Sequence, residues 1–352
     1  MKIKTTYTAN AENVKFLGRT YYKENRLFCA LSGSGAEFSF TGTNCVIHIT
    51  GDEGSSKETE YNNHARLGIY VNGTRMIDDM IDKKEKTYTV FESETDENIT
   101  VTIVKLSEAP MSTFSIDGIT VTGSEIKPTK EKDLYIEFVG DSITCGYGVD
   151  DPVAEHPFST KTEDVTKAYA YKTAQALDAD YSMVSFSGYG IISGYTENGE
   201  KLLTQLVPPL YTKLGYSWTE NKDFCPSDLE WDFGKRQPDI IVVNLGTNDD
   251  SYTQDETLRQ EDYAANYTEF LKKVRANNPK SKILCTLGIM GDRLFEYVRR
   301  AVQNYMDETG DSNIHTMKFD VQLESDGYSA DYHPSITTHD KATQKLVAEI
   351  KK

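Results

Sequence analysis

The sequence has few cysteines, and they are not arranged for bridges or for a metal. Its 352 residues contain five cysteines, an odd number without a C-x-x-C pair. Disulfide frameworks use even numbers of cysteines, and zinc sites use close pairs of Cys or His. The spacings H-x-x-x-H and E-x-x-H are absent as well. The sequence therefore predicts free thiols in a reducing compartment, and it predicts neither a metal nor another cofactor.

Positive charge and long apolar runs are also scarce. Lysine and arginine number 38 against 55 aspartates and glutamates, which gives a formal net charge of −17. Nucleic acid and anionic membranes both require a basic surface, so we expect neither as a partner, and a neutral ligand such as a sugar fits better. No apolar run is long enough to span a bilayer, and residues 1–8 lack the apolar core of a signal peptide. These absences predict a cytoplasmic protein; the alternative is a secreted one whose signal has been removed.

The sequence does contain two successive patterns, of which the first is β-rich. Over the first third of the chain, short apolar runs with period-two alternation are separated by Gly, Asn, Asp and Ser, as at the Asn72-Gly73 turn. Several short strands at this spacing predict an antiparallel sandwich of jelly-roll type over residues 1–126. The polar segment over residues 123–132, which contains one proline, is interpreted as a linker.

From Asp133 to the C-terminus, strand-like and helix-like segments alternate. This order predicts a three-layer α/β/α domain over residues 133–352, with a mostly parallel sheet between the helices. The clearest buried strands are residues 134–139 and 239–245. In open parallel sheets, ligands bind at the carboxyl ends of the strands. The polar motifs of this domain follow such strand ends, so we expect a site there.

The motif Gly140-Asp141-Ser142 follows the first of these strands. A serine on a tight turn between a strand and a helix has its hydroxyl lifted out of the sheet, and its backbone N–H lies where a helix N-terminus favours an anionic oxygen. Ser142 is therefore the candidate nucleophile. The alternative is a structural Gly-Asp turn in which Ser142 caps a helix. Cys145 is a rival nucleophile, but we expect its thiol to point into the core with no basic group beside it.

Acyl transfer also requires a base and an oxyanion hole. His333 is the candidate base, and Asp331 is a candidate for orienting its imidazole. The backbone N–H groups of Ser142 and Gly188 and the side-chain amide of Asn248 are the candidate oxyanion donors. Taken singly, each motif could be a turn, a helix cap or a helix start. Their combination at strand ends favours a serine hydrolase.

These motifs resemble the four blocks of the SGNH, or GDSL-like, hydrolase superfamily, and the resemblance covers residues 133–352. The segment over residues 33–43 adds a closer resemblance, to carbohydrate esterase family 2, which Trp231-Asp232-Phe233 strengthens. That family pairs a jelly-roll domain with an SGNH domain and removes O-acetyl groups from plant polysaccharides and their oligosaccharides, so the resemblance implies the same fold and activity here. The blocks are Gly140-Asp141-Ser142, Gly188, Gly246-Thr247-Asn248-Asp249 and Asp331-Tyr332-His333-Pro334.

The spacing around the base departs from the common SGNH pattern. Most SGNH enzymes place the acid three residues before the histidine, whereas Asp331 lies two residues before His333. Carbohydrate esterase family 2 is similar in this respect, and some members work with a Ser-His dyad whose histidine is oriented by a backbone carbonyl. The role of Asp331 therefore stays open, and Asp326 is a weaker substitute.

Three aromatic residues are candidates for substrate binding. By the resemblance, Tyr332 would face the substrate near the base. Tyr189 and Trp218 are looser candidates for stacking on a sugar ring, and Trp218 lies in an aromatic-rich segment over residues 195–235 that suits a substrate-shaping loop. For each of the three, packing is the alternative role.

The sequence and the resemblance together predict a serine carbohydrate O-acetylesterase. The predicted partner is an acetylated hemicellulose oligosaccharide of glucomannan or xylan type, imported if the protein is cytoplasmic, and the reaction would pass through an acetyl-serine intermediate. Two alternatives stay open: another SGNH ester hydrolase that acts on aryl or lipid esters, and a non-catalytic carbohydrate-binding protein. The intact set of four blocks favours an enzyme, because a binding protein has no need of both Ser142 and His333.

Overall fold

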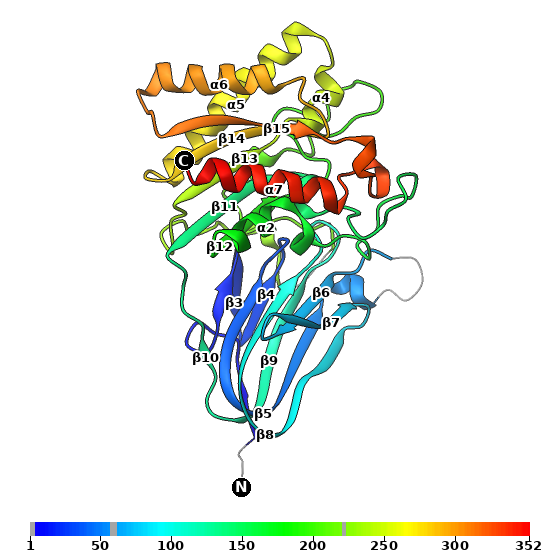
Figure 1. The fold of residues 1–352 in the computed structure, drawn as a ribbon, viewed down its shortest axis with the longest axis vertical. Helices are drawn as coiled ribbons and strands as arrows, with labels where there is room; N and C mark the ends of the chain where they lie inside the picture. The colour runs from blue at the N-terminus through cyan, green and yellow to red at the C-terminus, as the bar shows by residue number, and fades with distance from the viewer. Residues whose placement is uncertain (1–3, 57–61, 220–222) are drawn as a thin grey trace. The chain divides into compact units, whose positions relative to one another are not determined.

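The computed structural model describes residues 4–56, 62–219 and 223–352 (Figure 1). Residues 1–3, at the start of the predicted first domain, and residues 220–222, in the predicted substrate-shaping segment, lie outside the described residues. The chain divides into two compact units, and two short segments from beyond residue 132 belong to the first. Unit 1 comprises Met1–Glu131, Ser159–Glu163 and Lys213–Leu229, and unit 2 comprises Lys132–Phe158, Asp164–Thr212 and Glu230–Lys352.

Unit 1 contains a curled antiparallel sheet of ten strands. Its order is β3-β4-β9-β5-β8-β6-β7, with β1 paired to β9 and with β2 and β10 paired to β5. The long strands β5 and β8 pair with each other along most of their length. The strands are β1 (Lys4–Tyr7), β2 (Lys15–Leu17), β3 (Thr20–Lys23), β4 (Arg26–Cys29), β5 (Gly35–Gly51), β6 (Arg66–Val71), β7 (Thr74–Met80), β8 (Glu85–Lys105), β9 (Phe114–Gly123) and β10 (Lys127–Pro128).

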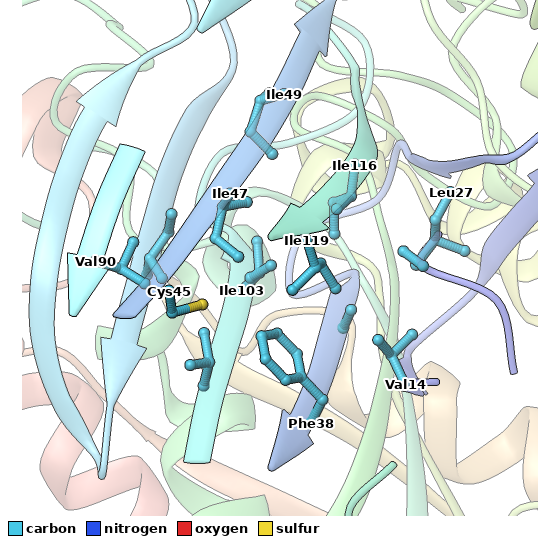
Figure 2. Packing of buried hydrophobic residues seen from close by; sticks show 14 of the residues in the cluster. Val14, Leu27, Phe38, Cys45, Ile47, Ile49, Val90, Ile103, Ile116 and Ile119 are labelled. Atoms are coloured by element: carbon cyan, nitrogen blue, oxygen red, sulfur yellow. The ribbon is translucent and has the colours of Figure 1, made fainter. Parts of the chain in front are cut away.

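The core of unit 1 follows from alternation along these strands. On β5 the buried positions are even-numbered from Ala36 to Gly42 and odd-numbered from Cys45, because the register shifts between Gly42 and Asn44. The shift keeps one face of the bent strand on the core, where Phe38, Cys45 and Ile47 lie among side chains of neighbouring strands (Figure 2). The prediction of an antiparallel β domain is confirmed, whereas its jelly-roll class stays a prediction.

Unit 2 is built on a parallel sheet of five strands, in the order β12-β11-β13-β14-β15. Its central strands are buried almost throughout, as is typical of a parallel sheet covered on both faces. The helices pack in pairs, α2 against α7 and α5 against α6. The predicted parallel α/β domain is therefore confirmed. The strands are β11 (Leu134–Gly140), β12 (Ala179–Ser185), β13 (Ile240–Asn244), β14 (Lys282–Ile289) and β15 (Ile314–Val321).

The helices of the described chain are mostly in unit 2. No helix among the described residues is both long and apolar enough to cross a membrane. The α-helices are α1 (Ser142–Cys145), α2 (Tyr169–Ala176), α3 (Val207–Leu210), α4 (Thr247–Thr253), α5 (Thr257–Asn277), α6 (Phe295–Thr309) and α7 (Ile336–Ile350). Single 3-10 turns lie at Glu53–Ser56, Val165–Lys167, Pro226–Asp228, Glu324–Asp326 and Ala330–Tyr332.

The carboxyl ends of the central strands carry the motifs of the predicted site. β11 ends at Gly140, where a Cβ would lie 2.1 Å from Oγ1 of Thr144, so the turn into α1 has room only for glycine. β13 ends at Asn244, shortly before α4. Because β11 pairs in parallel with both β12 and β13, the loops that follow these three strands meet at one edge of the sheet.

Candidate active site

The turn after β11 presents Ser142 at the start of α1. Asp141 is the N-cap of this single helical turn, and its carboxylate accepts a hydrogen bond from the Ile143 N–H (3.1 Å). Ser142 is only 5% exposed, and its hydroxyl oxygen lies 2.9 Å from Nε2 of His333. The structure thus brings together two predicted site residues that are 191 positions apart in the sequence.

The second ring nitrogen of His333 fixes the tautomer of the imidazole. Nδ1 lies 3.0 Å from the main-chain oxygen of Asp331. A carbonyl oxygen can only accept a hydrogen bond, so Nδ1 carries the proton and Nε2 is left to accept one from the Ser142 hydroxyl. This is the arrangement of a general base beside its nucleophile.

The Asp331 carboxylate has a different partner, because its Oδ2 accepts a hydrogen bond from the Tyr147 hydroxyl (3.1 Å). Asp331 and Tyr332 both have positive φ, 54° and 56°, which costs a residue with a side chain roughly 1–3 kcal/mol. This strained turn directs the Asp331 carbonyl toward the imidazole of His333. The weaker substitute, Asp326, forms an ion pair with Lys341 instead (2.7 Å).

The candidate oxyanion donors lie in the loops after β12 and β13. Gly188 has a φ of 81°, in the region that glycine adopts without strain. Asn248 is 7% exposed, and its amide donates one hydrogen bond to the main-chain oxygen of Tyr189 (2.8 Å). A side-chain amide has two N–H donors. The bond to Tyr189 therefore fixes the amide and leaves its second donor for a ligand.

Asp249 anchors the loop that follows Gly188. Its buried carboxylate accepts hydrogen bonds of 2.7–3.1 Å from the backbone N–H groups of Ile191, Ile192 and Ser193. Burial raises the pKa of Asp249 to about 6, although these three donors oppose the shift. In the sequence Asp249 stands out only as the last residue of Gly246-Thr247-Asn248-Asp249, and the loop that it holds becomes visible only in the fold.

The three candidate aromatic residues lie in different surroundings. Tyr332 is 52% exposed. Tyr189 is buried and packs against Phe186, with ring centroids 5.4 Å apart, so its ring lies in the core of unit 2. Trp218 belongs to unit 1, where its side chain is half exposed and its backbone N–H donates to the Pro110 carbonyl (2.8 Å). Sequence alone does not separate these cases, because exposure depends on the packing of distant segments.

Cys145, the rival nucleophile, lies in the core as expected. It is buried, and its thiol donates a hydrogen bond to the Ser185 hydroxyl (3.2 Å). A nucleophile has to reach the carbonyl carbon of its substrate, which a fully buried thiol does not do. Ser142 therefore remains the better candidate.

The site also contains Tyr147, which none of the sequence motifs singles out. The ring of Tyr147 stacks on the imidazole of His333, with centroids 3.8 Å apart and planes inclined at 17°. The available signal is its place between Gly146 and Gly148, which both have positive φ. A Gly-Tyr-Gly sequence indicates a tight turn, but it does not say what the ring contacts.

Two family models match the chain, and the first includes the candidate catalytic residues. The model described as GDSL-like Lipase/Acylhydrolase family matches residues 138–341. The model described as Carbohydrate esterase 2 N-terminal matches residues 16–129. The two matches together cover most of the chain, with the esterase N-terminal domain before the hydrolase domain, as the sequence motifs predict.

Named proteins are similar over nearly the whole chain. The Cellulase/esterase CelE of Acetivibrio thermocellus is 30% identical over 329 residues, which cover 92% of this chain but only 37% of that protein. An Acetylxylan esterase / glucomannan deacetylase of Cellvibrio japonicus is 23% identical, over 98% of this chain and 90% of its own length. The structure of a family two carbohydrate esterase from Clostridium thermocellum in complex with cellohexaose is 27% identical with a TM-score of 0.80, over 96% of this chain and 98% of that one.

The buried position of His333 predicts an unusual dependence of activity on pH. Burial lowers the pKa of His333 to about 4, and the carbonyl and carboxylate of Asp331 only partly oppose this shift. If His333 is the base, only its neutral imidazole can accept a proton from Ser142, so kcat/KM for an ester substrate should hold its plateau to about pH 5 and reach half of it near pH 4. The measurement is kcat/KM from pH 3.5 to 8.

Stability has to be followed in the same experiment. The folded-state pKa of His333 lies below the unfolded value of about 6.5, so the free energy of unfolding declines as the pH falls from about 6.5 towards 4. Circular dichroism at each pH separates unfolding from titration of the base. A folded protein whose activity halves near pH 6.5 would contradict a buried base.

Proposed function

Because the chain belongs to the GDSL-like lipase/acylhydrolase family and carries a carbohydrate esterase 2 N-terminal domain, we propose that it is a serine carbohydrate O-acetylesterase. The resemblance that the motifs indicate is confirmed by these family matches. The observation that carries the proposal is the 2.9 Å approach of the Ser142 hydroxyl to Nε2 of His333, whose Nδ1 is held by a main-chain oxygen. A serine hydroxyl within hydrogen-bond reach of a neutral imidazole is the arrangement of an activated nucleophile and its base.

The names of the relatives support a sugar ester as substrate. One is an acetylxylan esterase / glucomannan deacetylase, and another was solved with cellohexaose bound. We therefore propose acetylated hemicellulose oligosaccharides of xylan or glucomannan type, with the exposed ring of Tyr332 offered to the sugar. We also propose that unit 1 is a jelly-roll domain. Its long, bent strands β5 and β8, which pair with each other, support this assignment.

The proposed reaction begins when Oγ of Ser142 attacks the acetyl carbonyl carbon and Nε2 of His333 takes the hydroxyl proton. Negative charge then forms on the former carbonyl oxygen, where the N–H groups of Ser142 and Gly188 and the second amide hydrogen of Asn248 would donate. The bond to the sugar oxygen breaks, and His333 returns the proton to that oxygen. The products of this half-reaction are the free sugar hydroxyl and an acetyl-serine.

Hydrolysis of the acetyl-serine repeats these steps with water as the nucleophile. His333 takes a proton from the water, the same donors hold the oxyanion, and the bond to Oγ breaks as the proton passes to it. Acetate leaves, and Ser142 is restored. Each step is assigned to side-chain or main-chain groups of this chain.

The substrate proposal predicts rapid acetate release from acetylated xylan or glucomannan oligosaccharides. Ser142→Ala should lower that release at least about a thousandfold, because it removes the nucleophile. Acetate is measured enzymatically, and NMR of the product locates the acetyl group that is lost. The proposal is wrong if long-chain or aryl esters are strongly preferred, or if the oligosaccharides bind tightly without losing acetate.

The oxyanion role of Asn248 predicts a loss confined to the chemical step. Asn248→Ala should lower kcat by about 10²–10³-fold and leave KM within about threefold, because the donor acts on charge that develops in the transition state. Asn266→Ala, at an exposed position of α5, is the matched control and should change neither constant. An increase in KM with kcat unchanged would show that Asn248 binds the ground state of the substrate instead.

A further inference from the structure

Tyr147 connects the turn of the nucleophile to the loop of the base. Its backbone N–H donates to the main-chain oxygen of Ser142 (3.2 Å), as does that of Gly146 (3.1 Å), so its position is set directly by the nucleophile's turn. Gly148 follows with φ 62°, and a Cβ there would lie 2.8 Å from Cβ of Ala330. Gly148 thus lets the chain pass closely against Ala330, in the segment that precedes His333.

The ring of Tyr147 covers one face of the imidazole of His333. The centroids are 3.8 Å apart and the planes are inclined at 17°, which is a stacked contact. The Tyr147 ring also contacts Phe158, at 4.6 Å between centroids. A stack of this kind fixes the plane of the imidazole and therefore the direction in which Nε2 faces Ser142. An electron-rich phenol face also favours the imidazolium that forms when His333 takes the serine proton.

The hydroxyl of Tyr147 holds the other partner of the imidazole. It donates to Oδ2 of Asp331 (3.1 Å), while the main-chain oxygen of the same residue accepts the Nδ1 proton of His333 (3.0 Å). Asp331 therefore contacts Tyr147 through its side chain and His333 through its carbonyl. The contacts close a ring that runs from Ser142 through Tyr147, Asp331 and His333 back to Ser142.

The backbone of Asp331 needs such support. Asp331 and Tyr332 both lie at positive φ, and strained backbone of this kind persists only where its surroundings hold it. Three further hydrogen bonds hold this short segment, from Asp331 N to His156 O (3.0 Å), from Tyr332 N to Ala154 O (3.2 Å) and from Gln322 Nε2 to Tyr332 O (2.9 Å). These three hold the main chain, whereas Tyr147 holds the side chain of Asp331.

Building on the function proposed above, we propose that Tyr147 is a positioning residue for His333. Its ring sets the plane of the imidazole, and its hydroxyl fixes Asp331 so that the Asp331 carbonyl keeps the proton on Nδ1. The Asp331 carboxylate then contributes to catalysis through Tyr147. This explains how an acid two residues before the histidine serves the base without contacting its ring.

A double-mutant cycle on kcat tests this coupling. Tyr147→Phe keeps the stack and removes the hydroxyl, and Asp331→Ala removes its partner. Each single variant should lower kcat about tenfold and leave KM within about twofold. The kcat of the double variant should lie within about twofold of that of the less active single variant. Any strain that alanine adds at positive φ cancels in the cycle, because Asp331→Ala and the double variant both carry it. Independent, multiplying losses would overturn the proposal.

Two further variants sharpen the cycle. Asp331→Asn keeps an oxygen acceptor for Tyr147 without the charge. Its kcat should therefore be about fivefold higher than that of Asp331→Ala. If Asn is no better than Ala, the carboxylate acts on the imidazole by charge and the proposal is wrong. Tyr328→Phe removes a hydroxyl from the same C-terminal segment and should leave kcat unchanged. Thermal unfolding of each variant shows whether it is folded.

A measurement without substrate keeps this inference separate from the proposed function. The Nδ1 proton of His333, held by a carbonyl, should give a downfield proton NMR resonance that exchanges slowly with water. Tyr147→Phe should broaden or shift it, and Tyr328→Phe should not. If this response occurs in a protein that hydrolyses no acetyl ester, the positioning role stands and the proposed function fails. If the wild type is an active esterase and Tyr147→Phe changes neither the resonance nor kcat, only the positioning role fails.

Discussion

The hydrogen bond from Nδ1 of His333 to the main-chain oxygen of Asp331 is the interaction on which the rest of the site depends. At 3.0 Å it decides which ring nitrogen carries the proton, and so it leaves Nε2 to face the Ser142 hydroxyl. A carbonyl is a weaker support for an imidazolium than a carboxylate, because it carries no net charge. Burial therefore outweighs it and lowers the pKa of His333 to about 4, which keeps the base neutral at neutral pH.

Two different parts of unit 2 bring Ser142 and His333 into this arrangement. Parallel strands deliver Ser142, Gly188 and Asn248 to one sheet edge from three successive βα loops, where buried hydrogen bonds fix their geometry. The base arrives from the segment before α7, whose two residues at positive φ turn a carbonyl toward its ring. Rigid strands thus define the position of Ser142, the proposed nucleophile, and a strained, closely held turn defines that of His333, the proposed base.

The sequence predicts the parts of this site that depend on local pattern. The buried strand before Gly140-Asp141-Ser142 and the alternation of strands and helices are periodic features, so the fold of unit 2 and the place of Ser142 follow from them. The Asp331 carbonyl could not be predicted in the same way, because neither Asp331 nor Tyr332 is a glycine that would signal positive φ. Tyr147 meets Asp331 across 184 positions of sequence, and such packing has no period. The burial of Tyr189 and the place of Lys213–Leu229 in unit 1 are long-range features of the same kind.

The most direct test of the central claim is to react the protein with a phosphonate monoester that carries a good leaving group and to map the adduct by peptide mass spectrometry. Such a reagent traps a serine only when a neighbouring base removes its proton and an oxyanion hole accepts the phosphonyl oxygen. We expect one adduct, on Ser142, whose formation releases one leaving group per chain in a burst. His333→Ala should not form this adduct. An adduct at Cys145, or labelling of Ser142 that proceeds equally well without His333, would contradict the central claim.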